Sequence, residues 1–113
     1  MAWPFRNKSQ PVHFFKRIDV PAIAAGALKE YDRENTLRHF RKFAPYSNFH
    51  LVNDSQVSLD IVFDYNPDRS IKVIAGGTGD SKNQPFSSFT IENLDAATST
   101  DAGEVFLQIE TIR

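Results

Sequence analysis

The sequence predicts an all-β protein, a small antiparallel β-sandwich of the jelly-roll-like or immunoglobulin-like type. Two observations predict it: apolar and polar residues alternate along several short segments, and turn residues separate these segments at near-regular intervals. A small barrel fits the same pattern. With 113 residues, the chain has the length of one domain, and its composition is that of an ordinary globular protein, rich in phenylalanine and without cysteine.

The clearest strand signal lies in residues 57–64, Val-Ser-Leu-Asp-Ile-Val-Phe-Asp. Apolar residues occupy every second position from Val57 to Phe63, and a period of two places them on one face of a strand. A shift of the pairing by one residue would bury Asp60 and Asp64 without partners. We therefore expect one strongly specified register, with one dry face and one wet face.

Residues 1–11 show neither a helical nor a strand period, and two prolines bracket most of the segment. They predict an extended N-terminal arm, followed by a single β-sandwich domain over residues 12–113. The arm contains Trp3 and Phe5, whose rings water disfavours, so we expect it to dock on its own domain or on a neighbouring molecule.

Residues 12–20 alternate as a strand, and Lys16 on its apolar face indicates an edge position. Residues 27–31 predict a short strand followed by a polar turn. Residues 34–42 contain good helix formers and apolar residues at multiples of three, so both a short helix and a strand remain open there.

Beyond Pro45 the pattern is clearer. A strand over residues 48–52 is expected to form a hairpin with residues 57–64 through the turn at 53–56, and residues 66–69 form a second turn. The segment 76–84 has three glycines and no apolar side chain, which predicts a mobile surface loop. The remaining expectations are strands at 71–75, 86–92 (with Phe89 and Ile91 inward) and 104–112, and a polar connection at 93–103.

Motifs for metal, phosphate or catalytic chemistry are incomplete. The segment from Asp64 to Ser70 has oxygen ligands on alternate residues, but Arg69 and Ala75 stand where a calcium loop needs glycine and a bidentate carboxylate. The glycines and lysine of residues 76–82 lack the spacing of a phosphate loop. The three histidines show no paired spacing. We predict no metal, no cofactor and no enzymatic activity.

Basic and aromatic residues interleave over residues 38–43. Arg38, Arg41 and Lys42 form a possible polyanion patch, because rings that stack on bases and cations that follow phosphates are typical of single-strand nucleic-acid binding. The simpler interpretation places the phenylalanines inward and the basic side chains in water. Nucleic acid therefore remains an alternative partner, although it is not the expected one.

The net charge of −1 hides an asymmetry. Residues 1–42 contain nine basic and four acidic residues, whereas residues 43–113 contain four basic and ten acidic ones. An uneven spread over a solvated surface is one interpretation. The other is that a basic segment of one copy meets an acidic surface of another copy, or a polyanion.

Three segments of the C-terminal half are distinctive: Asn-Phe-His-Leu-Val-Asn-Asp-Ser at 48–55, Phe-Thr-Ile-Glu-Asn-Leu at 89–94 and Asp-Ala-Gly-Glu-Val-Phe-Leu-Gln-Ile at 101–109. In this order they resemble small β-sandwich proteins from the particles of phages and other prokaryotic viruses. The resemblance covers roughly residues 48–112. It implies a capsid, vertex, decoration or tail-associated protein, located in the virion after assembly in the host cytoplasm.

The expected function is thus that of a non-enzymatic structural protein that acts by self-association and contacts other virion proteins. The predicted interface anchors are Trp3, Phe5, Arg6, Phe14 and Phe15. The alternative is a carbohydrate- or protein-binding module that uses the loops at 76–84 and 93–103. No apolar run has the length of a membrane span.

Overall fold

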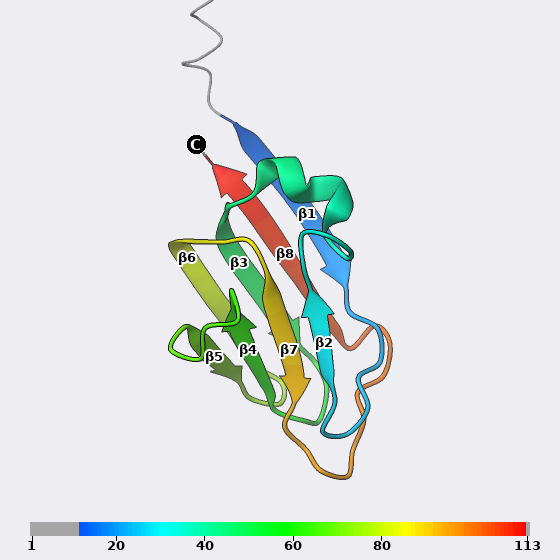
Figure 1. Ribbon diagram of the computed structural model, residues 1–113. Helices are drawn as coiled ribbons and strands as arrows, with labels where there is room; N and C mark the ends of the chain where they lie inside the picture. The colour runs from blue at the N-terminus through cyan, green and yellow to red at the C-terminus, as the bar shows by residue number, and fades with distance from the viewer. Residues whose placement is uncertain (1–11, 113) are drawn as a thin grey trace, which may run out of the picture.

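A computed structural model describes residues 12–112, which form two four-stranded antiparallel sheets packed face to face (Figure 1). Sheet A has the strand order β1-β8-β3-β6, and sheet B has the order β2-β7-β4-β5. The predicted β-sandwich is confirmed. The predicted arm over residues 1–11, with Trp3, Phe5 and Arg6, lies outside the described residues.

Eight strands and one 3-10 helix make up the described part of the chain. They are β1 (His13–Asp19), β2 (Leu28–Tyr31), η2 (Arg38–Phe43), β3 (Tyr46–Asn53), β4 (Leu59–Phe63), β5 (Ser70–Val73), β6 (Thr78–Phe86), β7 (Phe89–Asn93) and β8 (Val105–Ile112).

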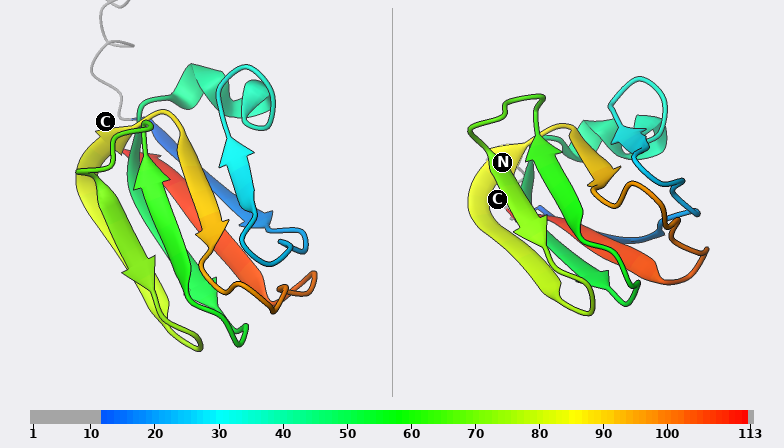
Figure 2. Two further views of the ribbon diagram at one scale, coloured as in Figure 1. Left: turned by 60° about the horizontal axis from the view of Figure 1, so that its bottom comes forward. Right: turned by 90° about the horizontal axis from the view of Figure 1, so that it is seen from below.

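The strand pairing decides between the two predicted types of sandwich. The first strand pairs with the last, β2 with β7, β3 with β6 and β4 with β5, so the pairs are nested as in one long hairpin. Folding this hairpin over itself adds the pairs β3·β8 and β4·β7. This arrangement is a jelly roll. Figure 2 shows the two layers and the connections that cross between them at both ends.

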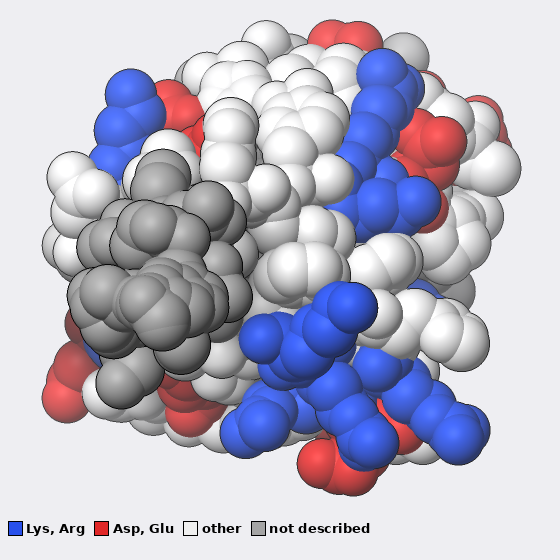
Figure 3. Space-filling view, turned by 90° about the horizontal axis from the view of Figure 1, so that it is seen from above, with Lys and Arg blue, Asp and Glu red and all other residues white. Residues whose placement is uncertain are grey.

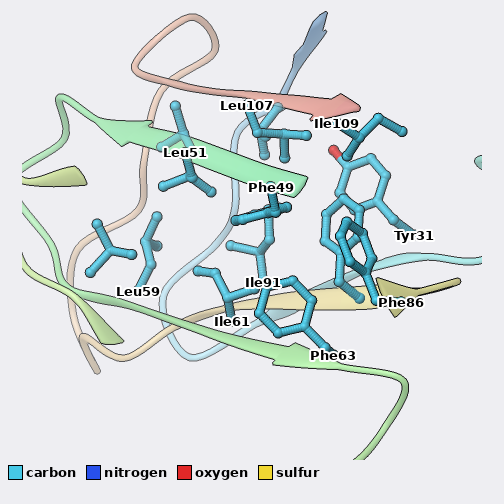
Figure 4. Close-up of a cluster of buried hydrophobic side chains, with 14 of the residues drawn as sticks. Tyr31, Phe49, Leu51, Leu59, Ile61, Phe63, Phe86, Ile91, Leu107 and Ile109 are labelled. Atoms are coloured by element: carbon cyan, nitrogen blue, oxygen red, sulfur yellow. The ribbon is translucent and has the colours of Figure 1, made fainter. Parts of the chain in front are cut away.

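The core follows from the alternation along the central strands. Inward residues of β3, β4, β7 and β8 are buried, and the outward ones remain partly exposed or bonded. Phenylalanine rings fill the middle of the core (Figure 4), with Phe63 centred 5.1 Å from Phe49 and 5.0 Å from Phe86. Edge-to-face and tilted ring pairs of this kind add to the gain from burial. The predicted inward positions of Phe89 and Ile91 are confirmed.

Strand β1 forms one edge of sheet A, as the position of Lys16 predicts. Its apolar face packs against η2, where the rings of Phe14 and Phe43 stack with centroids 4.1 Å apart. The Lys16 ammonium lies 5.3 Å from the centre of the Phe40 ring, so its charge stays at the rim of the core. For residues 34–42 the sequence left both a helix and a strand open. The structure has a 3-10 helix there, over residues 38–43.

The predicted hairpin between residues 48–52 and 57–64 is wrong. Strand β3 belongs to sheet A and β4 to sheet B, so the connection crosses between layers. Asn53, fully buried, directs this crossing: its Nδ2 donates to the carbonyl oxygens of Val57 (2.8 Å) and Ile74 (3.1 Å), and its Oδ1 accepts from the Ser55 amide (3.0 Å). These bonds turn the chain away from β3 and leave both edges of β3 free for β6 and β8.

The mobile loop predicted at 76–84 is also wrong, because most of it forms β6, the second edge of sheet A. Its backbone pairs with β3, and most of its side chains are exposed or half-buried, so apolar residues are not needed. Gly79 is required by packing, since a Cβ there would lie 2.6 Å from Val73 Cγ2. Phe86 ends this strand, and β7 begins at Phe89.

We expect Asn53→Ala to lower the free energy of unfolding by about 2–4 kcal/mol, because it removes the hydrogen bonds of this buried side chain with the Val57 and Ile74 carbonyls and with the Ser55 amide. Chemical denaturation followed by circular dichroism measures the loss. Gln56→Ala, an exposed side chain in the same connection, is the control and should change little. A loss below about 0.5 kcal/mol in Asn53→Ala would contradict the structural role of this corner.

Tyr31 offers a second test of the core. Its ring stacks on Phe89 at 4.8 Å, its hydroxyl has no hydrogen-bond partner within residues 12–112, and burial raises its pKa to about 12. Tyr31→Phe removes an unpaired polar atom, so we expect the free energy of unfolding to rise by about 1 kcal/mol. A decrease of that size in the same denaturation experiment would show that the hydroxyl is bonded.

Candidate functional site

The outer face of sheet A presents polar side chains in rows that run across all four strands. One row consists of Phe15, Glu110, Asn48 and Lys82, and the next of Arg17, Gln108, His50 and Asp80. Each row collects residues far apart in the sequence, because β8 and β3 are the central strands of this sheet. Between and around the rows the surface is hollowed into an open depression of about 380 Å³.

Hydrogen bonds hold Asn48 and Glu110, the two central residues of the first row, in place. Asn48 Nδ2 donates to Glu110 Oε1 at 2.8 Å, and the Nε2 atom of His13 lies 3.0 Å from Glu110 Oε2. Asn48 Oδ1 accepts from the backbone amide of Asn83 at 3.0 Å. The bond from Asn48, followed by the one from His13, holds the pKa of Glu110 below its ordinary value. Glu110 is thus an oriented carboxylate at neutral pH.

The second row contains one hydrogen-bonded pair, His50 and Asp80, and, among the described residues, one amide without a hydrogen-bond partner, that of Gln108. Nδ1 of His50 is hydrogen-bonded to Asp80 Oδ1, which orients the imidazole ring. Gln108 lies between Arg17 and His50 in the register. Its half-buried amide has no hydrogen-bond partner within residues 12–112. The middle of the depression therefore offers one donor and one acceptor group to a ligand.

An apolar corner, defined here as Phe15 and Ile112, borders the depression at the β1 edge. Phe15 is 55% exposed and Ile112 is 53% exposed. Ile112 pairs with His13 and Phe15 with Glu110, so the two apolar side chains are diagonal neighbours on the same face. Val12, the first residue that the structure describes, precedes β1.

The predicted interface anchors are separated by the structure. Phe15 belongs to the apolar corner, whereas Phe14 points to the other face and stacks on Phe43. Phe14 thus contributes at least part of its ring to the packing of its own chain. The role of both residues as anchors stays a prediction, as does that of Trp3, Phe5 and Arg6.

The predicted polyanion patch lies on η2. Arg38, Arg41 and Lys42 are exposed there, and Arg41 lies 3.8 Å from the carboxylate of Glu34. The phenylalanines of the same segment pack inward, in agreement with the simpler interpretation. We call this end, with η2 and the start of β1, the helical end. Lys and Arg side chains gather on it (Figure 3).

Acidic side chains gather at the opposite end of the sandwich, the loop end. The connections that follow β3 and β7 there contain Asp54, Asp95, Asp101 and Glu104. Bonds from the backbone amides of Ala97 and Thr98 lower the pKa of Asp95, so this carboxylate stays charged. A smaller hollow of about 170 Å³ lies in the same connections.

The incomplete calcium motif has a structural explanation. Asp64 Oδ1 accepts from the backbone amides of Ser87 (2.8 Å) and Ser88 (3.1 Å), and its other oxygen lies 3.0 Å from Arg69 Nη1. This carboxylate therefore connects the end of β4 to the β6–β7 connection by hydrogen bonds. Within residues 12–112 no group of three or more His, Asp or Glu side chains is arranged to hold a metal ion.

Sequence reasoning missed the depression for an identifiable reason. Asn48, His50, Gln108 and Glu110 fall on the polar faces of predicted strands, but their meeting depends on the pairing of β3 with β8. Asp80 and Lys82 fall in the segment predicted as a loop. The sequence did contain one signal for a binding surface. Amide, imidazole and carboxylate side chains alternate with apolar ones along both strands, at Asn48 and His50 and at Gln108 and Glu110.

No family model matches the chain, and no curated protein matches it. The resemblance to proteins of virus particles therefore stays a prediction. In the part of the chain that the structure describes, no helix has the length and apolar character required to cross a bilayer.

The hydrogen-bonded state of Glu110 predicts an effect of pH. Because its pKa is lower in the folded than in the unfolded chain, the carboxylate stabilises the fold above the ordinary glutamate pKa. That contribution is lost as the pH falls through the lowered value.

We expect Asn48→Ala to raise the pKa of Glu110 towards its ordinary value in a carboxyl NMR titration. Lys72→Ala, on sheet B, should leave it unchanged. An unshifted pKa in Asn48→Ala would contradict the assignment.

Proposed function

We propose that this protein is a non-enzymatic structural subunit of a virus particle that works by self-association. The observation that carries the proposal is the apolar corner, in which Phe15 of the edge strand β1 and Ile112 of the neighbouring β8 are both more than half exposed. Large apolar side chains that cluster on a surface are typical of protein interfaces. The neighbouring residues 1–11 add Trp3 and Phe5 to the same end of the sequence.

The fold supports the same function by analogy. Jelly rolls are frequent in viral capsid proteins, although they also occur in lectins and in enzymes of the cupin type. A fold alone does not determine a function. The free edges of sheet A and the apolar corner are features of this chain that the analogy does not supply.

The distribution of charge suggests which surfaces meet. Basic side chains of η2 lie at the helical end, and acidic side chains lie in the connections of the loop end. A head-to-tail contact between copies brings opposite charges together and generates a ring or a filament. The helical end would also supply contacts to other virion proteins, in a particle assembled in the host cytoplasm.

Size-exclusion chromatography with light scattering tests self-association. We expect the intact chain to be oligomeric, and both Phe15→Ser and deletion of residues 1–11 to weaken the association at least about tenfold. Added salt should also weaken it, because the charged ends are exposed.

Leu28→Ser is the matched control, because Leu28 is 50% exposed but lies on the outer face of sheet B. It should leave the mass unchanged. A monomeric intact chain at high concentration would overturn the proposal, as would an oligomer that neither Phe15→Ser nor the deletion affects.

A further inference from the structure

We infer that the depression on the outer face of sheet A binds a neutral carbohydrate. The side chains that would contact it are Asn48, His50, Gln108 and Glu110 from the two central strands, with Asp80 and Lys82 of β6 on one side. This inference rests mainly on polar residues that the self-association proposal does not use, and Phe15 is the residue that both proposals share.

The spacing of these groups suits a small polyhydroxylated ligand. Neighbouring strands lie about 4.8 Å apart, and side chains on one face follow each other at about 6.6 Å along a strand. Asn48 and Glu110 are cross-strand partners, as are His50 and Gln108. Four planar polar groups therefore form a compact grid, within reach of the hydroxyl groups of one or two sugar rings.

Most of these groups are fixed before any ligand arrives. Glu110 is held by Asn48 and His13, Asn48 by the Asn83 amide, and His50 by Asp80. A ligand would therefore lose little of its binding energy to ordering these side chains. The lone pairs of Glu110 and the second ring nitrogen of His50 remain available for further bonds.

Gln108 identifies the centre of the site. It is the half-buried amide that has no hydrogen-bond partner within residues 12–112, and fixed polar groups stand on either side of it. An amide both donates and accepts, and so does a hydroxyl group. A sugar with adjacent hydroxyl groups can satisfy Gln108 and its neighbours together, whereas an apolar ligand would leave them unpaired.

The charges favour a neutral ligand over an anion. Two carboxylates, Asp80 and Glu110, line the depression against one lysine, Lys82, and this balance disfavours phosphate, sulfate and other anions. They do not form part of a three-ligand metal cluster within residues 12–112. Phe15 lies at the rim and presents an exposed ring, on which the C–H face of a sugar can pack.

A two-dimensional ¹H–¹⁵N NMR titration of the full chain tests the site. The probes are cellohexaose, xylohexaose, mannohexaose, maltohexaose and N-acetylchitohexaose, with a heparin-derived hexasaccharide as the anionic comparison. We expect at least one neutral probe to shift amides of β3 and β8 around Asn48–His50 and Gln108–Glu110. Gln108→Ala should weaken that binding at least about tenfold, which corresponds to one lost hydrogen-bonding group.

Glu92→Gln, a polar substitution on the outer face of sheet B, is the matched control and should bind as the intact chain does. Gln108→Glu keeps the size of the side chain and should also weaken binding, because it removes the amide donor. Three results would overturn the inference: no neutral probe shifts these amides, only the heparin hexasaccharide binds, or Gln108→Ala binds with unchanged affinity. Shifts confined to residues 93–103 would be a case of the first result.

Discussion

The nested pairing of strands is the constraint on which the rest of the structure depends. Apart from the β4–β5 hairpin within sheet B, consecutive strands lie in different sheets, so the chain crosses the sandwich after β3 instead of turning back. Asn53 makes the crossing possible, because its buried amide satisfies carbonyl groups of both the crossing and the β5–β6 connection. Once β4 has left for sheet B, β3 can pair with β6 on one side and β8 on the other.

The features proposed to act in function all follow from this arrangement. Pairing β3 with β8 brings Asn48 beside Glu110 across 62 residues of sequence. Strand β1, which pairs with the last strand, lies at an edge of sheet A, with Phe15 and Ile112 exposed on the outer face. The inward faces of the same strands form the phenylalanine-rich core. One face of sheet A thus stabilises the domain, while the other is free for contacts with ligands or further copies.

Local patterns predict most of the strands but not their partners. Alternation from Val57 to Phe63 and along residues 104–112 is a property of each segment, so both strands and their inward faces can be predicted. Strand β6 cannot be predicted in this way, since its mostly polar side chains show no apolar alternation and its pairing with β3 makes it a strand. The candidate site depends on pairing in the same way: its residues are visible in the sequence, but their proximity is not.

Hydrogen–deuterium exchange at low and high protein concentration tests the central claim most directly, which is that the β1 edge of sheet A is an assembly surface. The account predicts that backbone amides of β1 that face away from β8 become protected as the concentration rises. Amides of β5, an edge of sheet B, should remain unchanged. Equal exchange of β1 at both concentrations, or new protection confined to β5, would contradict the account.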